Sequence, residues 1–256
     1  TNMDWGRIYL HTDEDFKAEE ILAKIFGVTS FSRVIETTSD LTDICKTTAE
    51  YARQVIPPKG TFAVRARRAG DHAYSSQDVA REAGSAILSA NEDMNLKVNL
   101  SQPDIELFVE VRHNRTFIFS EKQQGPGGFP LGTQGKVLAV ISDKKSVYAA
   151  WLMMKRGCTL KVLCTDEDAL TYAQRLKLWN LGSQPKKVQE ESNLLDAAKT
   201  LAKKARAQAL VLGHSYKEFE SAPKIQADIP IFYPLIGMSK EEIERKITSL
   251  FGDDWK

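Results

Sequence analysis

Residues 137–146 read Val-Leu-Ala-Val-Ile-Ser-Asp-Lys-Lys-Ser, an unbroken apolar run that passes directly into a polar turn. A short apolar run rich in β-branched residues is typical of a strand buried on both faces of a sheet. The residues after the turn place Val147, Trp151 and Met154 at helical spacing, which predicts a helix over 146–156. This strand, turn and helix begin an alternation that continues to the end of the chain.

Three further strands and three further helices are expected in residues 136–256. The strands are predicted at 160–164, 209–213 and 229–233, and the helices near 166–181, 192–206 and 239–251. Alternation of this kind implies parallel strands with right-handed crossovers, so we expect a Rossmann-like parallel-sheet domain. Ligands of such sheets bind beyond the carboxyl ends of the strands. The loops at 142–146 and at Gly213-His214-Ser215 are therefore the two natural sites.

The first half of the chain is organised differently. Residues 1–39 predict a strand at 7–11 and a helix at 20–26, half of a split βαβ unit that is too short to bury a core alone. Because the other half is lacking and Thr1 is not an initiator Met, we expect a trimmed start. Residues 40–124 predict an α/β module with amphipathic helices and paired strands. Residues 125–135 contain five glycines and predict a flexible linker.

Composition limits the function classes. The chain has 256 residues and a formal net charge of +1. Although residues 136–256 hold 20 basic and 15 acidic side chains, overall charge does not favour RNA binding. Three cysteines without C-x-x-C spacing predict no structural metal, and their odd number favours a reducing compartment. With no signal peptide and no apolar run of membrane-spanning length, we expect a cytoplasmic protein without membrane contact.

Basic residues gather around the strand at 61–67. Alternate arginines on one strand face can hold phosphates, and the helix start that follows offers free backbone N–H groups to an anion. The candidate RNA-binding residues are Arg65, Arg67, Arg68, His72, Ser75, Ser76 and Asn99. A solvated strand face is the alternative for the arginines, and ordinary turn chemistry is the alternative for Asn99.

The loop Ser142-Asp143-Lys144-Lys145-Ser146 has the position of a phosphate cradle, because a helix N-terminus follows a buried strand. Its composition argues against catalysis. A tight cradle needs glycine so that the backbone can approach the phosphates, and this loop has bulky residues instead. An ordinary solvated loop is the alternative. Cys158 and Cys164 are expected to be small core residues rather than sulfur carriers.

Several motifs resemble one known family. The segment from Phe62 to Arg68, with His72 and Ser75-Ser76, is similar to the THUMP RNA-binding domain. Residues 127–138 resemble the segment that leads into the ATP-pyrophosphatase (PP-loop) domain of tRNA 4-thiouridine synthetases, and residues 152–157 and 233–238 continue the match. The resemblance covers nearly the whole chain. It implies a partial ferredoxin-like domain at 1–39, a THUMP domain at 40–124, a linker at 125–135 and a PP-loop domain at 136–256.

The resemblance also implies partners and chemistry. The THUMP domain would dock the acceptor stem and CCA end of a tRNA, while ATP in the PP-loop domain would adenylate a uridine for sulfur transfer. The chain departs from the family at three places. Asp143, Lys144 and Lys145 replace the glycines and the acid of S-G-G-x-D-S, the later G-E-S-x-G-Q stretch is reduced to Gly213-His214-Ser215-Tyr216, and the long insertion with the catalytic cysteine is absent.

We therefore expect a tRNA-binding protein of this family with a degenerate PP-loop, which acts in tRNA thiolation without its own ATP-dependent catalysis. A sulfur donor or a partner enzyme would supply the chemistry, and a homodimer is left open. No metal is expected, and ATP is the one cofactor that the resemblance suggests. Two alternatives remain: an active 4-thiouridine synthetase with an altered ATP loop, and a nucleotide-binding regulatory protein.

Overall fold

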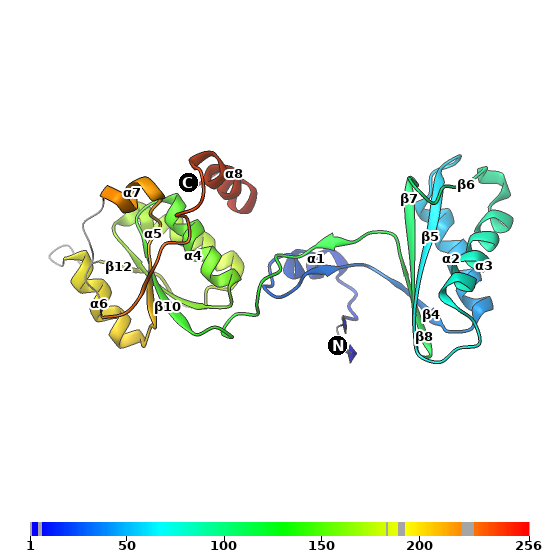
Figure 1. Cartoon of the computed structure of the whole chain (residues 1–256), viewed down its shortest axis with the longest axis horizontal. Helices are drawn as coiled ribbons and strands as arrows, with labels where there is room; N and C mark the ends of the chain where they lie inside the picture. Colours follow the sequence, from blue (N-terminus) through cyan, green and yellow to red (C-terminus); the bar gives the residue numbers. More distant parts are fainter. Residues whose placement is uncertain (1, 5–6, 183, 189–192, 222–227, 256) are drawn as a thin grey trace. The chain divides into compact units, whose positions relative to one another are not determined.

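The computed structural model describes residues 2–4, 7–182, 184–188, 193–221 and 228–255 (Figure 1). The chain divides into two compact units. Unit 1 combines Thr1–Ser30 with Gln124–Lys256, and unit 2 is Phe31–Gln123. Two short strands, β3 (Ser30–Phe31) and β9 (Gln123–Gln124), pair where the chain passes between the units. Each unit has its own α/β fold, as the sequence predicts.

Unit 2 is a five-stranded mixed sheet in the order β4-β8-β7-β5-β6. Its strands are β4 (Ile35–Thr38), β5 (Thr61–Ala69), β6 (Lys97–Val98), β7 (Ile105–Arg112) and β8 (Arg115–Phe119). β5 is parallel to β6 and β7, while β8 is antiparallel to β4 and β7. β4 lies within residues 1–39, which the sequence predicted to be a separate preceding domain. In the structure this strand is part of the sheet of unit 2.

Two helices cover one face of this sheet: α2 (Leu41–Val55) and α3 (Ser76–Ala90) (Figure 1). Asp40 caps α2, and Ser75 forms the predicted capping box with Asp78 at the start of α3. The helices bury Ile44 and Ile87 against the sheet, which contributes Phe62 to the same core. A 3-10 turn (Glu92–Met94) follows α3.

Unit 1 is built on a parallel sheet in the order β12-β11-β10-β13-β14. Its strands are β10 (Lys136–Ile141), β11 (Thr159–Cys164), β12 (Lys186–Lys187), β13 (Ala209–Val211) and β14 (Ile231–Phe232). The four predicted strands are all present. β12 is an additional two-residue edge strand, which no hydrophobic pattern marks because both of its lysines are exposed.

The helices of unit 1 are α4 (Lys144–Lys155), α5 (Glu167–Ala173), α6 (Leu194–Ala205), α7 (Tyr216–Ser221) and α8 (Lys240–Phe251). α4, α5 and α8 share one core with one face of the sheet, and α6 packs in a separate core on the other face. The helix predicted at 166–181 is instead α5 followed by a 3-10 segment, Gln174–Trp179. α7 was not predicted, because its six residues are too few to show a helical period.

The N-terminal segment contains two antiparallel strands, β1 (Asn2–Asp4) and β2 (Arg7–Tyr9), and the helix α1 (Asp15–Leu22). The prediction of a helix at 20–26 was wrong in its bounds, since α1 ends at Leu22. The apolar residues beyond it serve tertiary packing instead. Phe26 is 3% exposed, with its ring 5.4 Å from Trp179 and 5.5 Å from Trp151. This segment therefore shares the core of unit 1.

Residues 125–135 are not the flexible linker that the sequence predicts. Their backbone N–H groups donate hydrogen bonds to the turn between α4 and β11. Phe129 N donates to Lys155 O, and Gly132 N and Gln134 N both donate to Gly157 O. Gly128 is required by this close approach, because a β-carbon there would lie 2.1 Å from Lys155 O. The glycines thus allow backbone packing within unit 1.

Candidate functional site

The sheet of unit 1 changes winding direction between its neighbouring strands β10 and β13. From β10 the chain proceeds to β11 and β12 on one side, and then returns to β13 and β14 on the other side. In open α/β sheets this topological switch point is where ligands bind, outside the carboxyl ends of the strands. The loop after β10 holds Ser142 and Asp143, and the loop after β13 holds Gly213, His214 and Ser215. Both loops chosen from the sequence therefore lie at the switch point.

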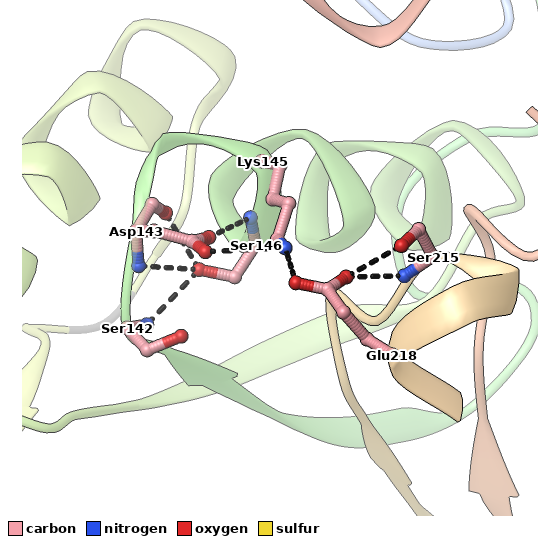
Figure 2. A network of polar contacts seen from close by, with 6 residues as sticks. All are labelled: Ser142, Asp143, Lys145, Ser146, Ser215 and Glu218. Carbon is pink, nitrogen blue, oxygen red and sulfur yellow. Dashed lines mark hydrogen bonds and ion pairs between the residues drawn. The ribbon is translucent and has the colours of Figure 1, made fainter. Parts of the chain in front are cut away.

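In the loop after β10, the side chains of the loop accept hydrogen bonds from its backbone N–H groups (Figure 2). Asp143 is the N-cap of α4, and its carboxylate accepts from Ser146 N at 2.9 Å. Ser146 Oγ accepts from Ser142 N at 3.0 Å and from Asp143 N at 3.1 Å, and it donates to Asp143 O at 2.6 Å. Ser146 is 2% exposed. Its hydroxyl therefore bonds the two backbone N–H groups that directly precede the first turn of α4.

Lys145 joins this loop to α7 (Figure 2). Its ammonium contacts the carboxylate of Glu218 directly and lies 3.6 Å from Asp143 Oδ2. The second oxygen of Glu218 accepts from Ser215 N at 2.8 Å and from Ser215 Oγ at 2.7 Å. Burial raises the pKa of Glu218, but the bonds from Lys145 and Ser215 outweigh burial and lower the pKa to about 2. Glu218 is thus held as a carboxylate.

Lys144 is engaged by aromatic rings rather than by an anion. Its ammonium lies 5.4 Å from the ring centre of Trp255 and 5.8 Å from that of Tyr172. The two rings meet edge to face at 5.7 Å, and the guanidinium of Arg175 lies over Trp255 as well. Cation–π contacts of this kind stabilise a lysine ammonium without an anion. Both lysines that the sequence offered for anion binding therefore have partners within unit 1.

The structure separates the candidate arginines of β5 onto different faces of the sheet. Arg65 donates to Glu106 at 2.9 Å and to Leu100 O at 2.8 Å, so it is committed within unit 2. Arg67 is exposed and lies opposite Glu110 in the strand register. Arg68 is exposed too, and it pairs with Val111, a residue of the helix-covered core face. The alternation that the sequence predicted is present, but Arg68 belongs to the opposite face from Arg65 and Arg67.

Arg68 and His72 lie together at the carboxyl end of β5. Arg68 donates to Gly70 O at 2.8 Å and lies 3.5 Å from His72 Nδ1. The ring of His72 stacks on Tyr74 at 5.2 Å, and Tyr74 donates to Ser39 O near the start of α2. Ser75 and Ser76 follow at the start of α3, where the Ser75 hydroxyl is engaged in the capping box. These residues form a basic and aromatic corner beside a helix N-terminus.

Asn99 is placed as turn chemistry predicts. Its amide donates to Gln102 O at 2.7 Å, and its carbonyl accepts from Ser101 N and Gln102 N. All of these bonds are local, within 99–102. Asn99 therefore has a structural role in the turn before β7.

The three cysteines lack an activated thiol. Cys158 and Cys164 are buried, as the sequence predicted for core residues. Burial raises the pKa of Cys158, and burial with the nearby Asp166 raises the pKa of Cys164 to about 12. Burial also raises the pKa of Cys45, which lies on α2 in unit 2. None of the three pKa values is lowered, as it is in a thiol activated for nucleophilic attack.

Sequence reasoning missed Glu218, Tyr172 and Trp255 as neighbours of the 142–146 loop. Ser215 and Glu218 are spaced as a capping box, and this local signal marks the start of α7. No local pattern connects either residue to Lys145, which lies 73 positions before Glu218. In the part of the chain that the structure describes, no group of His, Cys, Asp and Glu could hold a metal ion, and no helix is long and apolar enough to cross a membrane.

Comparisons with known proteins agree on one family. Residues 38–121 match the THUMP domain family. A "Probable tRNA sulfurtransferase" of Methanosarcina mazei is 34% identical over 94% of this chain and 69% of its own length. A "Probable tRNA sulfurtransferase" of Methanobrevibacter smithii is also 34% identical, over 94% of this chain and 74% of its own length.

Two solved structures share the fold. A 4-thiouridine synthetase in complex with RNA and ATP has a TM-score of 0.82 at 23% identity, over 99% of this chain and 76% of that one. A Pyrococcus horikoshii Ot3 protein has a TM-score of 0.75 at 26% identity, over 93% of this chain and 82% of that one. With a THUMP domain and relatives of this similarity, the chain belongs to the tRNA sulfurtransferase family.

Proposed function

We propose that this protein binds tRNA in the pathway of tRNA thiolation and does not itself carry out the ATP-dependent step. The observation that supports this most directly is that side chains of the protein itself already bond the N–H groups and the lysine of the loop after β10. Ser146 Oγ takes the N–H groups of Ser142 and Asp143, and Glu218 takes the ammonium of Lys145. A nucleotide phosphate would have to displace these contacts to reach the helix N-terminus.

The thiol chemistry supports the same proposal. Sulfur transfer through a protein cysteine needs a thiolate, and burial raises the pKa of Cys45, Cys158 and Cys164 alike. The alignment with the Methanosarcina mazei relative extends over 282 positions, more than the 256 residues of this chain. That relative therefore has stretches inside the matched region that this chain lacks. We take these missing stretches as further support for a chain that does not carry out the ATP-dependent step.

RNA binding is proposed for unit 2, whose residues 38–121 match the THUMP family. The basic corner with Arg68 and His72, together with exposed Arg67, would contact phosphates and position the acceptor stem and CCA end. Ser75 and Ser76 would add the N-terminus of α3. Arg65 and Asn99 would contribute less, because Arg65 is ion-paired with Glu106 and Asn99 uses its amide within the 99–102 turn.

Binding of unmodified tRNA with an intact CCA end, measured across a salt series, tests the RNA part. The Arg67→Ala/Arg68→Ala variant should bind more weakly, with a slope of log K against log salt reduced by about 2, because two phosphate contacts are lost. Arg53→Ala is the matched control, since Arg53 is an exposed arginine of unit 2 paired with Asp93. Absence of tRNA binding, or binding independent of salt, would refute the proposal.

Turnover is tested separately. The protein is incubated with ATP, a sulfide source and unmodified tRNA, and AMP and 4-thiouridine are measured. We expect neither product. Formation of both would identify an active synthetase with an altered ATP loop, while nucleotide binding without any tRNA binding would identify a regulatory protein.

A further inference from the structure

The contact between Lys145 and Glu218 links the two loops of the switch point. Lys145 lies in the first turn of α4, which follows β10, and Glu218 lies in α7, which follows β13. Figure 2 shows their side chains pointing toward one another, with Ser215 on the far side of the carboxylate. The Ser215 N–H and hydroxyl hold one carboxylate oxygen, which leaves the other oxygen directed at Lys145.

The ammonium of Lys145 is already engaged by carboxylates of the chain itself in this arrangement. It contacts Glu218 and lies 3.6 Å from Asp143, so two carboxylates share one positive charge. The remaining cation of the loop, Lys144, lies over Tyr172 and Trp255. The net charge of Asp143, Lys145 and Glu218 together is negative. Glu218 therefore weakens the attraction of a phosphate to the start of α4, where the ammonium groups and the helix N-terminus would otherwise favour an anion.

A carboxylate and a phosphate accept the same bonds from an ammonium group. We propose that Glu218 is an internal anion that keeps the switch point closed to nucleotide phosphates by holding Lys145. This inference rests on the proposed function, because it names the contact that keeps ATP from the loop. Removal of the carboxylate leaves Lys145 with Asp143 alone, beside the N-terminus of a twelve-residue helix.

Calorimetric titration of the full chain with ATP, and separately with inorganic pyrophosphate, tests the inference. The variants Glu218→Ala and Glu218→Gln should bind both ligands at least about tenfold more tightly than the wild-type protein. Glu220→Ala is the matched control, because it removes an exposed carboxylate of the same helix and should leave binding unchanged. The double variant Lys145→Ala/Glu218→Ala should lose the gain, since the freed ammonium is gone.

Two results would overturn the inference: no gain over the wild-type affinity in either Glu218 variant with a native melting temperature, or an equal gain in Glu220→Ala. Glu218→Gln keeps the size of the side chain, so it remains informative where Glu218→Ala fails to fold. The tRNA titration of the wild-type protein separates the two proposals. Intact tRNA binding with no gain in the Glu218 variants refutes the closed switch point alone, whereas absent tRNA binding refutes the proposed function.

Discussion

Gly213 and Ser146 are in backbone contact where the two switch-point loops meet. A β-carbon on Gly213 would lie 2.6 Å from Ser146 Cα and 2.8 Å from Ser146 Cβ. The obstructing atoms belong to the first turn of α4, which cannot give way as a flexible side chain would. Gly213 therefore lets β13 and its loop pass directly beside the loop after β10.

Gly213→Ala should destabilise unit 1 by about 1–3 kcal/mol, because an overpacked core site forces its neighbours to shift. Denaturant unfolding of the full chain measures the effect. Gly237→Ala is the control, since a β-carbon on Gly237 meets no atom within 4 Å. Equal stability of the two variants would contradict the contact.

Ser146→Ala should cost about 1–2 kcal/mol of stability. The substitution leaves Ser142 N and Asp143 N without their acceptor in a partly buried loop. Ser142→Ala should stay within about 0.5 kcal/mol of the wild-type protein, because Ser142 is exposed. Thermal melts compare the two variants, and similar melting temperatures for both would show that the hydroxyl of Ser146 does not stabilise the loop.

Glu218 should make stability depend on pH. Its pKa in the folded protein is lowered from 4.5 to about 2, so its contribution is full above pH 4.5 and is lost as the pH falls toward 2. The side chains of Lys145 and Glu218 are 26% and 43% exposed, and solvent screening limits the contribution to about 1 kcal/mol.

Melting temperatures between pH 2 and pH 6 test this dependence. The loss of stability on acidification should be smaller in Glu218→Gln than in the wild-type protein, because the amide does not titrate in that range. Glu220→Gln, on the same helix, should follow the wild-type curve. Parallel curves for wild type and Glu218→Gln would mean that the Lys145 contact does not stabilise the fold.

Phe26→Ala should destabilise unit 1 by about 3–5 kcal/mol, because the ring is 3% exposed between Trp151 and Trp179. Phe16→Ala removes a ring that is 77% exposed and should change stability by less than about 0.5 kcal/mol. Chemical unfolding followed by tryptophan fluorescence reports on this core. A Phe26→Ala protein as stable as Phe16→Ala would mean that the N-terminal segment is not part of unit 1.

Local sequence patterns determined the elements and most of the architecture. The apolar run at 137–141 and its repeats predicted the parallel sheet, and Ser75 with Asp78 predicted the start of α3. These patterns are visible in the sequence because apolar residues repeat at a fixed period on the buried faces of helices and strands. Helix caps are visible because they bond residues only three or four positions apart. The position of the 142–146 loop at the switch point followed from the same alternation.

Only the tertiary structure shows which groups contact the charged side chains of the 142–146 loop. Glu218 reaches Lys145 across 73 positions, Trp255 reaches Lys144, and Phe26 enters a core formed by the other end of the chain. Each contact depends on how the connections between strands bring distant segments together. The spacing of residues along the chain does not predict such contacts. The sequence shows a loop from Ser142 to Ser146 that contains no glycine. The fold shows that the Ser146 hydroxyl accepts from Ser142 N and Asp143 N, and that the Glu218 carboxylate contacts Lys145.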